Sequence, residues 1–87
     1  MIQILLPNGE TIQVEWMAVA QLDGVLRFNT IGVEPLELIR IFSNPENCSP
    51  LSRVFDGTTT DVYTDYTVFR GINVNYDNTA MISLSKF

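Results

Sequence analysis

Hydrophobic and polar residues alternate almost without a break in the last third of the chain, from Tyr66 to Phe87. Before a short interruption at Asp77-Asn78-Thr79, the apolar residues of one parity are Tyr66, Val68, Ile72, Val74 and Tyr76, and after it they are Ala80, Ile82 and Leu84. A period of two is typical of strands that bury one face. The pattern therefore predicts a terminal β-hairpin, and Gly71, which interrupts its first arm, predicts a bulge or a close backbone approach.

The first third of the chain predicts three antiparallel strands. Ile2 to Leu6 and Glu10 to Trp16 flank Pro7-Asn8-Gly9, where Asn-Gly can supply the positive φ angles of a tight hairpin turn. The apolar residues of the second arm share one parity: Ile12, Val14, Trp16, Ala18, Ala20 and Leu22. A second turn at Asp23-Gly24 would pair this arm with the strand from Val25 to Ile31.

The middle of the chain predicts one short helix near residues 35–43. Glu34-Pro35 has the features of a helix start, because proline suits the first turn and an acid there complements the helix dipole. Leu36 and Ile39, with Leu38 and Phe42, are expected to form the apolar stripe. Asn44-Pro45 would end the helix.

After this helix we expect a loop over residues 43–52, in which Pro50-Leu51-Ser52-Arg53 can form another helical turn. Val54-Phe55 predicts a strand, Asp56-Gly57-Thr58 a turn, and the threonine-rich run to Tyr63 the next strand. The elements predict an α+β domain, mainly antiparallel β, with about six strands, two or more hairpins and one short helix near residues 35–43. A small twisted barrel with the helix in one end is the alternative. At 87 residues the chain is expected to be a single domain, residues 1–87.

Charge and composition exclude several classes of partner. Ten acidic and five basic residues give a net charge of −5, and the bases are scattered singly at Arg27, Arg40, Arg53, Arg70 and Lys86. No basic stripe could follow a phosphate backbone, so we expect no direct binding of nucleic acid. The N-terminus lacks a basic region and a long apolar stretch, so we expect neither export nor membrane insertion. The single Cys48 forms no intramolecular disulfide, in keeping with a cytoplasmic protein.

The chain contains no histidine, which removes the commonest general base and most zinc ligands. Cys48 has no imidazole to activate it, so a nucleophilic role is not expected. We expect no catalytic residue, no metal and no cofactor, and therefore not an enzyme. The three aspartates of the densest acidic segment offer hard oxygen ligands, but their spacing fits no calcium loop; they are Asp56, Asp61 and Asp65.

Aromatic residues are the best candidates for contact with a partner, because aromatics are enriched at the centres of interfaces. Phe69 lies off the expected buried parity, which makes it the best single candidate for an exposed anchor. Tyr63 and Tyr66 are further candidates, although most aromatics are expected to pack in the core. The candidate interaction residues are therefore Phe69, Tyr63 and Tyr66, together with Asp56, Asp61 and Asp65.

The terminal hairpin resembles small accessory proteins of bacteriophages and prophages of Gram-positive bacteria. In these a threonine-rich strand precedes a run that matches Tyr66-Thr67-Val68-Phe69, Gly71-Ile72, Val74 and Tyr76-Asp77, followed by an apolar strand with Met81, Ile82 and Leu84. The resemblance covers about a quarter of the chain and assigns no catalytic residue. It implies a protein that acts in the cytoplasm of a bacterial host or is incorporated into the virion.

Two functions of different classes follow. The first is a structural or assembly component of a virion or tail module, which self-associates or docks on another protein through strand edges and aromatics. The alternative is a small anti-defence inhibitor, similar in role to anti-CRISPR proteins, that binds a host effector. A variant of it, an oligomer that sequesters a nucleotide messenger, needs basic or backbone donors that face the phosphates, and the suitable basic residues are Arg27, Arg53 and Arg70. We expect a protein partner or a homo-oligomer.

Overall fold

The computed structural model describes all 87 residues, and seven strands in it form one antiparallel sheet. The strands are β1 (Ile2–Leu5), β2 (Thr11–Val19), β3 (Leu26–Ile31), β4 (Leu51–Phe55), β5 (Thr58–Tyr63), β6 (Val68–Val74) and β7 (Thr79–Ser85). Between β3 and β4 lie helix α1 (Pro35–Phe42) and a short 3-10 helix η1 (Pro45–Asn47). The expected α+β fold, mainly antiparallel, is confirmed. The sheet has seven strands where about six were expected, and residues 51–53, where a further helical turn was considered, instead extend the strand expected at Val54-Phe55 into β4.

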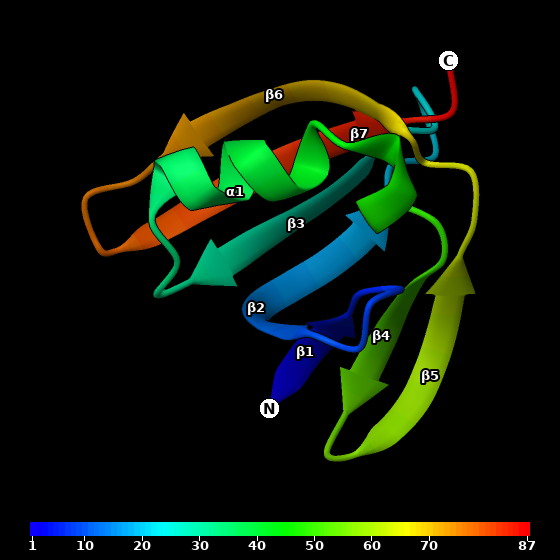
Figure 1. Cartoon of the computed structure of the whole chain (residues 1–87), viewed down its shortest axis with the longest axis horizontal. Coiled ribbons are helices and arrows are strands. Elements are labelled where there is room, and N and C mark those ends of the chain that lie inside the picture. Colours follow the sequence, from blue (N-terminus) through cyan, green and yellow to red (C-terminus); the bar gives the residue numbers. More distant parts are fainter.

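The order of strands in the sheet is β5-β4-β1-β2-β3-β7-β6. Four hairpins join neighbours in sequence, and the crossover that contains α1 carries the chain from β3 to the other side of β1. The strongly curved sheet wraps around α1, which lies over β3 and β7 and beneath β6 in Figure 1. The sheet is open between β5 and β6, whose ends are joined by residues 64–67 alone.

Helix α1 buries one face on this curved sheet. Its buried residues are Leu38, Ile41 and Phe42, at the spacing of one helical face. The expectation that Leu36 belongs to the apolar stripe is wrong, since its side chain is 82% exposed. Pro35 begins the helix as predicted, and the N–H of Ser43 bonds the carbonyl of Ile39 at its end.

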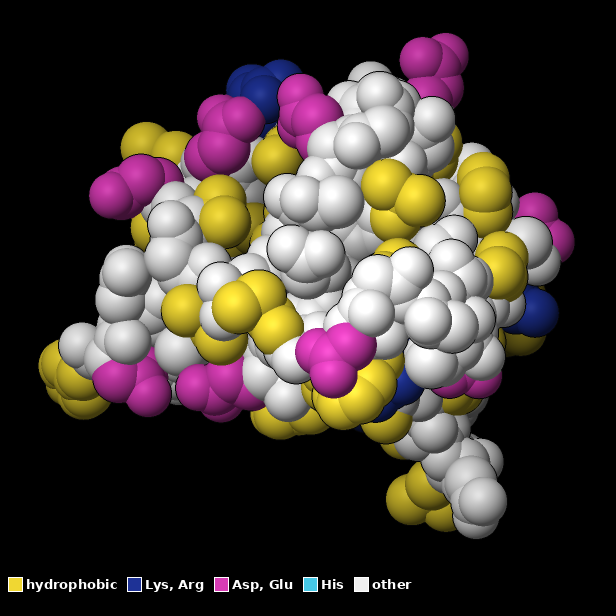
Figure 2. All heavy atoms as spheres, turned by 90° about the horizontal axis from the view of Figure 1, so that it is seen from below, with side chains coloured by type: hydrophobic (Ala, Val, Ile, Leu, Met, Phe, Trp, Pro, Cys, Tyr) yellow, Lys and Arg dark blue, Asp and Glu magenta, His cyan; other side chains and the backbone are white.

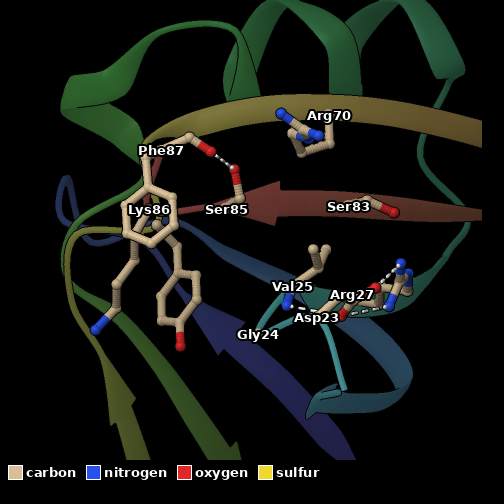
Figure 3. Close-up of a pocket in the computed structure, with 10 residues that line it drawn as sticks. Asp23, Gly24, Val25, Arg27, Arg70, Ser83, Ser85, Lys86 and Phe87 are labelled. Atoms are coloured by element: carbon tan, nitrogen blue, oxygen red, sulfur yellow. Dashed lines mark hydrogen bonds and ion pairs between the residues drawn. The ribbon is translucent and has the colours of Figure 1, made fainter. Parts of the chain in front are cut away.

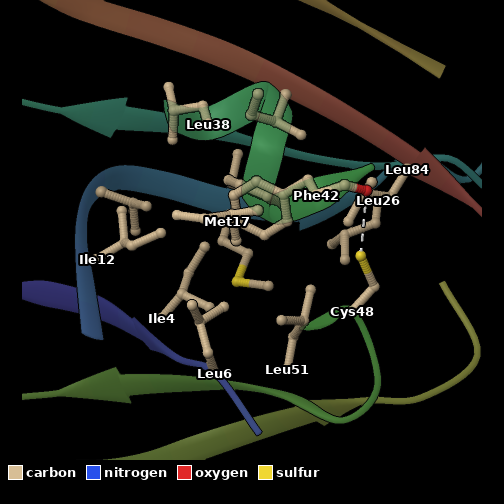
Figure 4. Close-up of a cluster of buried hydrophobic side chains, with 14 of the residues drawn as sticks. Ile4, Leu6, Ile12, Met17, Leu26, Leu38, Phe42, Cys48, Leu51 and Leu84 are labelled. Carbon is tan, nitrogen blue, oxygen red and sulfur yellow. Dashed lines mark hydrogen bonds between the residues drawn. The ribbon is translucent and has the colours of Figure 1, made fainter. Parts of the chain in front are cut away.

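Fifteen buried apolar residues form one core, with contributions from α1 and both halves of the sheet. Figure 4 shows Ile4, Leu6 and Leu51 facing Phe42 and Leu84 across it. The first hairpin turn differs from expectation: only Gly9 has a positive φ, of 91°, and its N–H bonds the carbonyl of Leu6. This is the geometry of a turn with proline at its second position and glycine at its fourth. No helix is both long and apolar enough to cross a membrane.

Bulges change which residues of two strands face the core. In β2 the register shifts between Val14 and Trp16, so that Met17 is buried and Trp16 is exposed. The expectation that Trp16, Ala18 and Leu22 lie on the same face as Ile12 and Val14 is therefore wrong beyond the bulge. In β6 the register shifts between Phe69 and Gly71, which confirms the bulge predicted from Gly71.

Candidate functional site

The bulge in β6 decides the position of Phe69. Phe69 pairs with the buried Leu84 and packs, half-buried, against the core. The expectation that Phe69 lies off the buried face is wrong, because Arg70 is the extra residue of the bulge and shifts the alternation by one. Conversely, Val74 and Tyr76, which the alternation placed on the buried face, are exposed near the tip of the hairpin.

The two candidate tyrosines lie where the chain passes from β5 to β6. The rings of Tyr63 and Tyr66 meet edge to face with centroids 6.2 Å apart, and both are half-buried against the core. Burial raises the pKa of Tyr63, and the carboxylate of Asp61 adds to the shift. The pair therefore lies at the open side of the sheet, where β5 ends and the connection to β6 begins.

The three candidate aspartates do not converge. Asp56 pairs with the N-terminal ammonium group at 2.8 Å, and Asp61 lies opposite Arg53 across the β4–β5 ladder. Asp65 occupies a turn with a φ of 68°, where its N–H donates to Ser49 Oγ. No group of three acidic or cysteine side chains is close enough to hold a metal ion. In the face of the molecule that Figure 2 shows, acidic side chains are dispersed among apolar ones and form no single cluster.

The edge of β5 is the most open part of the sheet. β5 pairs only with β4, and five of its six residues are exposed. Its outer row of backbone N–H and C=O groups has no neighbouring strand to bond, which is a template for a further strand. One bulge, at Thr60, and one charge, Asp61, are the only interruptions along it.

Apolar side chains also lie near this edge on the outer face of the sheet. The registers align Leu5 with Ser52 and Ser52 with Val62 in one row, and Val54 lies in the next row, between Gln3 and Thr59. Because side chains alternate between faces, this row lies opposite the buried Ile4 and Leu51. The Val62 side chain, at the edge itself, is 57% exposed. The edge therefore offers both backbone groups and apolar side chains.

A second surface is a groove of about 660 Å³ on the outer face of β3, β7 and β6, which we name the basic groove (Figure 3). Its cationic side chains are Arg27, Arg70 and Lys86, three of the five in the chain. The only acidic side chain that lines it is Asp23, so the lining side chains carry two positive charges more than negative ones. The remaining lining residues are Gly24, Val25, Tyr66, Ser83, Ser85 and Phe87. A positive hollow on a chain of net charge −5 attracts small anions.

Each cation of the basic groove is held differently. The Asp23 carboxylate accepts a hydrogen bond from the Arg27 guanidinium at 2.9 Å, and this bond lowers the pKa of the Asp23 carboxyl. A second hydrogen bond, from the N–H of Val25, lowers the same pKa further. Lys86 Nζ lies 5.2 Å from the centre of the Tyr66 ring, within range of a cation–π interaction. Arg70, the bulged residue of β6, is exposed and makes no hydrogen bond or ion pair.

The sequence indicated only part of this groove. Arg27 and Arg70 were expected as the donors that a nucleotide would need, and the structure brings both to the groove, whereas Arg53 lies on β4 and bonds Thr60. Lys86, Ser83 and Phe87 were not singled out. The alternation of Ser83 and Ser85 with buried residues places them on the outer face, but only the pairing of β3 with β7 brings Arg27 beside them.

The lone thiol belongs to the core. Cys48 is fully buried, its Sγ lies 3.4 Å from the carbonyl oxygen of Phe42, and burial raises its pKa to about 11. A thiol held neutral in this way is a poor nucleophile. Comparison with protein-family models, curated proteins and solved structures finds no match to this chain.

Proposed function

We propose that this chain is a non-enzymatic, phage-type accessory protein that acts through protein–protein contacts, and that the edge of β5 is its contact surface. The observation that carries the proposal is the uncovered β5 edge, six residues long, with the apolar side chains of Leu5, Val54 and Val62 on the outer face near it. Strand addition at such an edge supplies backbone hydrogen bonds, and the side chains beside it supply specificity. The resemblance of the terminal hairpin supports the phage-type class.

The occupant that suits the edge best is a second copy of this chain. An antiparallel pair of β5 strands about a two-fold axis between Thr60 and Asp61 sets Thr59 opposite Val62 and Thr58 opposite Tyr63. Asp61 then faces Thr60, so like charges do not lie directly opposite each other. A core of fifteen residues is small, and self-association is a common way for chains of this size to gain stability.

A homodimer formed in this way is a building block, which suits assembly of a virion or tail module in the host cytoplasm. The alternative, an inhibitor of a bacterial defence effector, uses the same edge against a strand of the effector. The two differ in what the purified protein does alone, since an assembly component pairs with itself and an inhibitor of this kind remains a monomer.

The experiment is light scattering coupled to size-exclusion chromatography on three proteins. We expect a dimer for the native chain and a monomer for Val62→Lys, because a lysine at the edge opposes strand addition. Val74→Lys is the matched control: Val74 is 60% exposed, close to the 57% of Val62, but lies on β6 at the other end of the sheet. A native monomer overturns the self-associating function and favours the inhibitor, whereas a Val62→Lys dimer excludes the β5 edge.

A further inference from the structure

We propose that the basic groove binds a nucleoside phosphate, with the phosphate at its Arg27–Arg70 end and the base at its Tyr66–Phe87 end. This goes beyond the contact proposed for β5 and uses the opposite part of the sheet. Figure 3 shows the two ends: Arg27, Arg70 and Ser83 lie at one, and Phe87 and Lys86 at the other.

The strand register builds the phosphate end. Arg27 on β3 pairs with Ser83 on β7, and Ser83 pairs with Gly71 on β6. Neighbouring strands are about 4.8 Å apart, so the two outer backbones lie about 10 Å from each other, with the Ser83 hydroxyl between them. Gly71 has no side chain to cover this hydroxyl, and the preceding Arg70 supplies the cation on that side. A phosphate seated over Ser83 would be within reach of both guanidinium groups.

The donors at this end are partly organised in advance. Asp23 engages two N–H groups of Arg27, at 2.9 and 3.5 Å, which orients the guanidinium and leaves its other donors free. The Arg70 guanidinium and the Ser83 hydroxyl make no hydrogen bond within the chain. Arginine forks match phosphate oxygens in geometry and charge, so two arginines about a hydroxyl suit a phosphate better than a single carboxylate.

The other end suits an aromatic base. Phe87 is almost fully exposed and lies beside Tyr66 in the lining, while Ser85 donates its hydroxyl to the carbonyl of Phe87 and holds that residue over the groove. Lys86, over the Tyr66 ring, adds a third cation at this end. Proteins that bind single-stranded nucleic acids without sequence preference stack bases on aromatic rings next to cationic side chains, and the same two elements suit a single nucleotide.

The size of the groove limits the ligand to a small molecule. Its volume of about 660 Å³ is within the range of small-molecule sites, roughly 300–1,000 Å³. The two remaining cationic side chains do not extend the positive charge of the groove, because Arg40 is paired with Glu37 on α1 and Arg53 lies on β4. A single nucleotide therefore fits the charge pattern, and a continuous nucleic-acid strand does not.

The test is isothermal titration calorimetry at low ionic strength with three probes: ADP, inorganic pyrophosphate and adenosine. We expect ADP to bind at submillimolar concentration, pyrophosphate to bind more weakly because it lacks the base, and adenosine not to bind measurably. Added salt should weaken ADP binding, since the groove is exposed and its charges are screened. Absence of heat with ADP at millimolar concentration overturns the proposal. Equal affinity for ADP and pyrophosphate also overturns it, because the aromatic end then contributes nothing.

Two variants locate the site. Arg70→Ala should weaken ADP binding about tenfold, because it removes a charge-assisted contact from an exposed side chain that supports no other residue. Arg40→Ala removes an exposed arginine from α1 and is the matched control, for which we expect unchanged affinity. Thermal denaturation of both variants verifies that they are folded. Native affinity in Arg70→Ala, or equal losses in the two variants, excludes the groove as the site.

Discussion

The ring of Phe42 in helix α1 lies 5.1 Å from the ring of Phe28 in β3, centroid to centroid, with the two planes inclined by 60°. Both residues are fully buried. This contact joins the only α-helix to β3, an inner strand of the sheet. Tilted aromatic pairs of this kind are favoured by the charge distribution of the rings, in addition to the apolar area that they bury.

Phe42→Ala should therefore lower the free energy of unfolding by about 3–5 kcal/mol, the usual cost of removing a buried phenylalanine. Leu36→Ala in the same helix is the control, with an expected change within about 0.5 kcal/mol because Leu36 is exposed. Urea denaturation followed by far-ultraviolet circular dichroism measures both. Equal losses in the two variants would contradict the packing described for α1.

Phe69→Ala should lower the free energy of unfolding by about 2 kcal/mol, less than for a fully buried ring, because Phe69 is half-buried against the core. The measurement is again urea denaturation, with Tyr76→Ala, an exposed residue beyond β6, as control. If Phe69→Ala keeps native stability and loses only binding to a partner, then Phe69 is an exposed anchor and its packing is not as described.

The stability of the fold should decrease as the pH rises from about 9 to about 11, in part through Cys48. The pKa of its thiol is about 11 in the folded chain, against an ordinary value of 9.0, so over this interval the folded state binds the proton more tightly than the unfolded state does. The loss is about 1.4 kcal/mol for each pH unit of difference. Denaturation at pH 8 and pH 10.5 should show a smaller alkaline loss in Cys48→Ala than in the native chain. An identical loss would mean that the thiol titrates normally.

Gly9→Ala should cost about 1–2 kcal/mol of stability, because an L-residue is strained at a φ of 91°. No heavy atom beyond its chain neighbours lies within 4 Å of the added methyl group, so the cost is one of backbone conformation. Asn78→Gly, in the turn between β6 and β7 at a φ of 65°, relieves the same strain and should not destabilise. Thermal denaturation compares the two, and a neutral Gly9→Ala would contradict the turn geometry.

Neither calcium nor magnesium at millimolar concentration should raise the melting temperature. A metal that binds only the folded chain stabilises it by mass action, but Asp56, Asp61 and Asp65 lie apart, in two turns and a strand. Differential scanning fluorimetry with each metal, and with a chelator as reference, makes the comparison. A dose-dependent rise in melting temperature would show a site that these residues do not explain.

Local signals in the sequence were sufficient for most elements. Period-two alternation predicted the terminal hairpin, Asp23-Gly24 the second turn, and Pro35 the start of the helix, because these depend on residues close in the chain. The faces of β2 and β6 were harder to predict. A single extra residue, Glu15 or Arg70, reverses the alternation, and its position depends on the partner strand.

The sites depend on contacts that alternation does not encode. The pairing of β1 with β4 leaves β5 at an edge, and the pairing of β3 with β7 brings Arg27 beside Ser83, which is 56 positions later in the chain. Residues so far apart meet only when the whole sheet is in register. The aspartates, which are close in sequence, are separated by the strand and turns that hold them.

The short connection of residues 64–67 acts as a tether between the two borders of the sheet. From Tyr63 to Val68 an extended chain spans at most about 18 Å, so the borders cannot spread further apart at that end. A second copy that pairs β5 with β5 about a two-fold axis occupies the free edge of β5 in both chains. Strand addition at β5 would then stop at two copies, because a symmetric pair leaves no free β5 edge from which a fibre could grow.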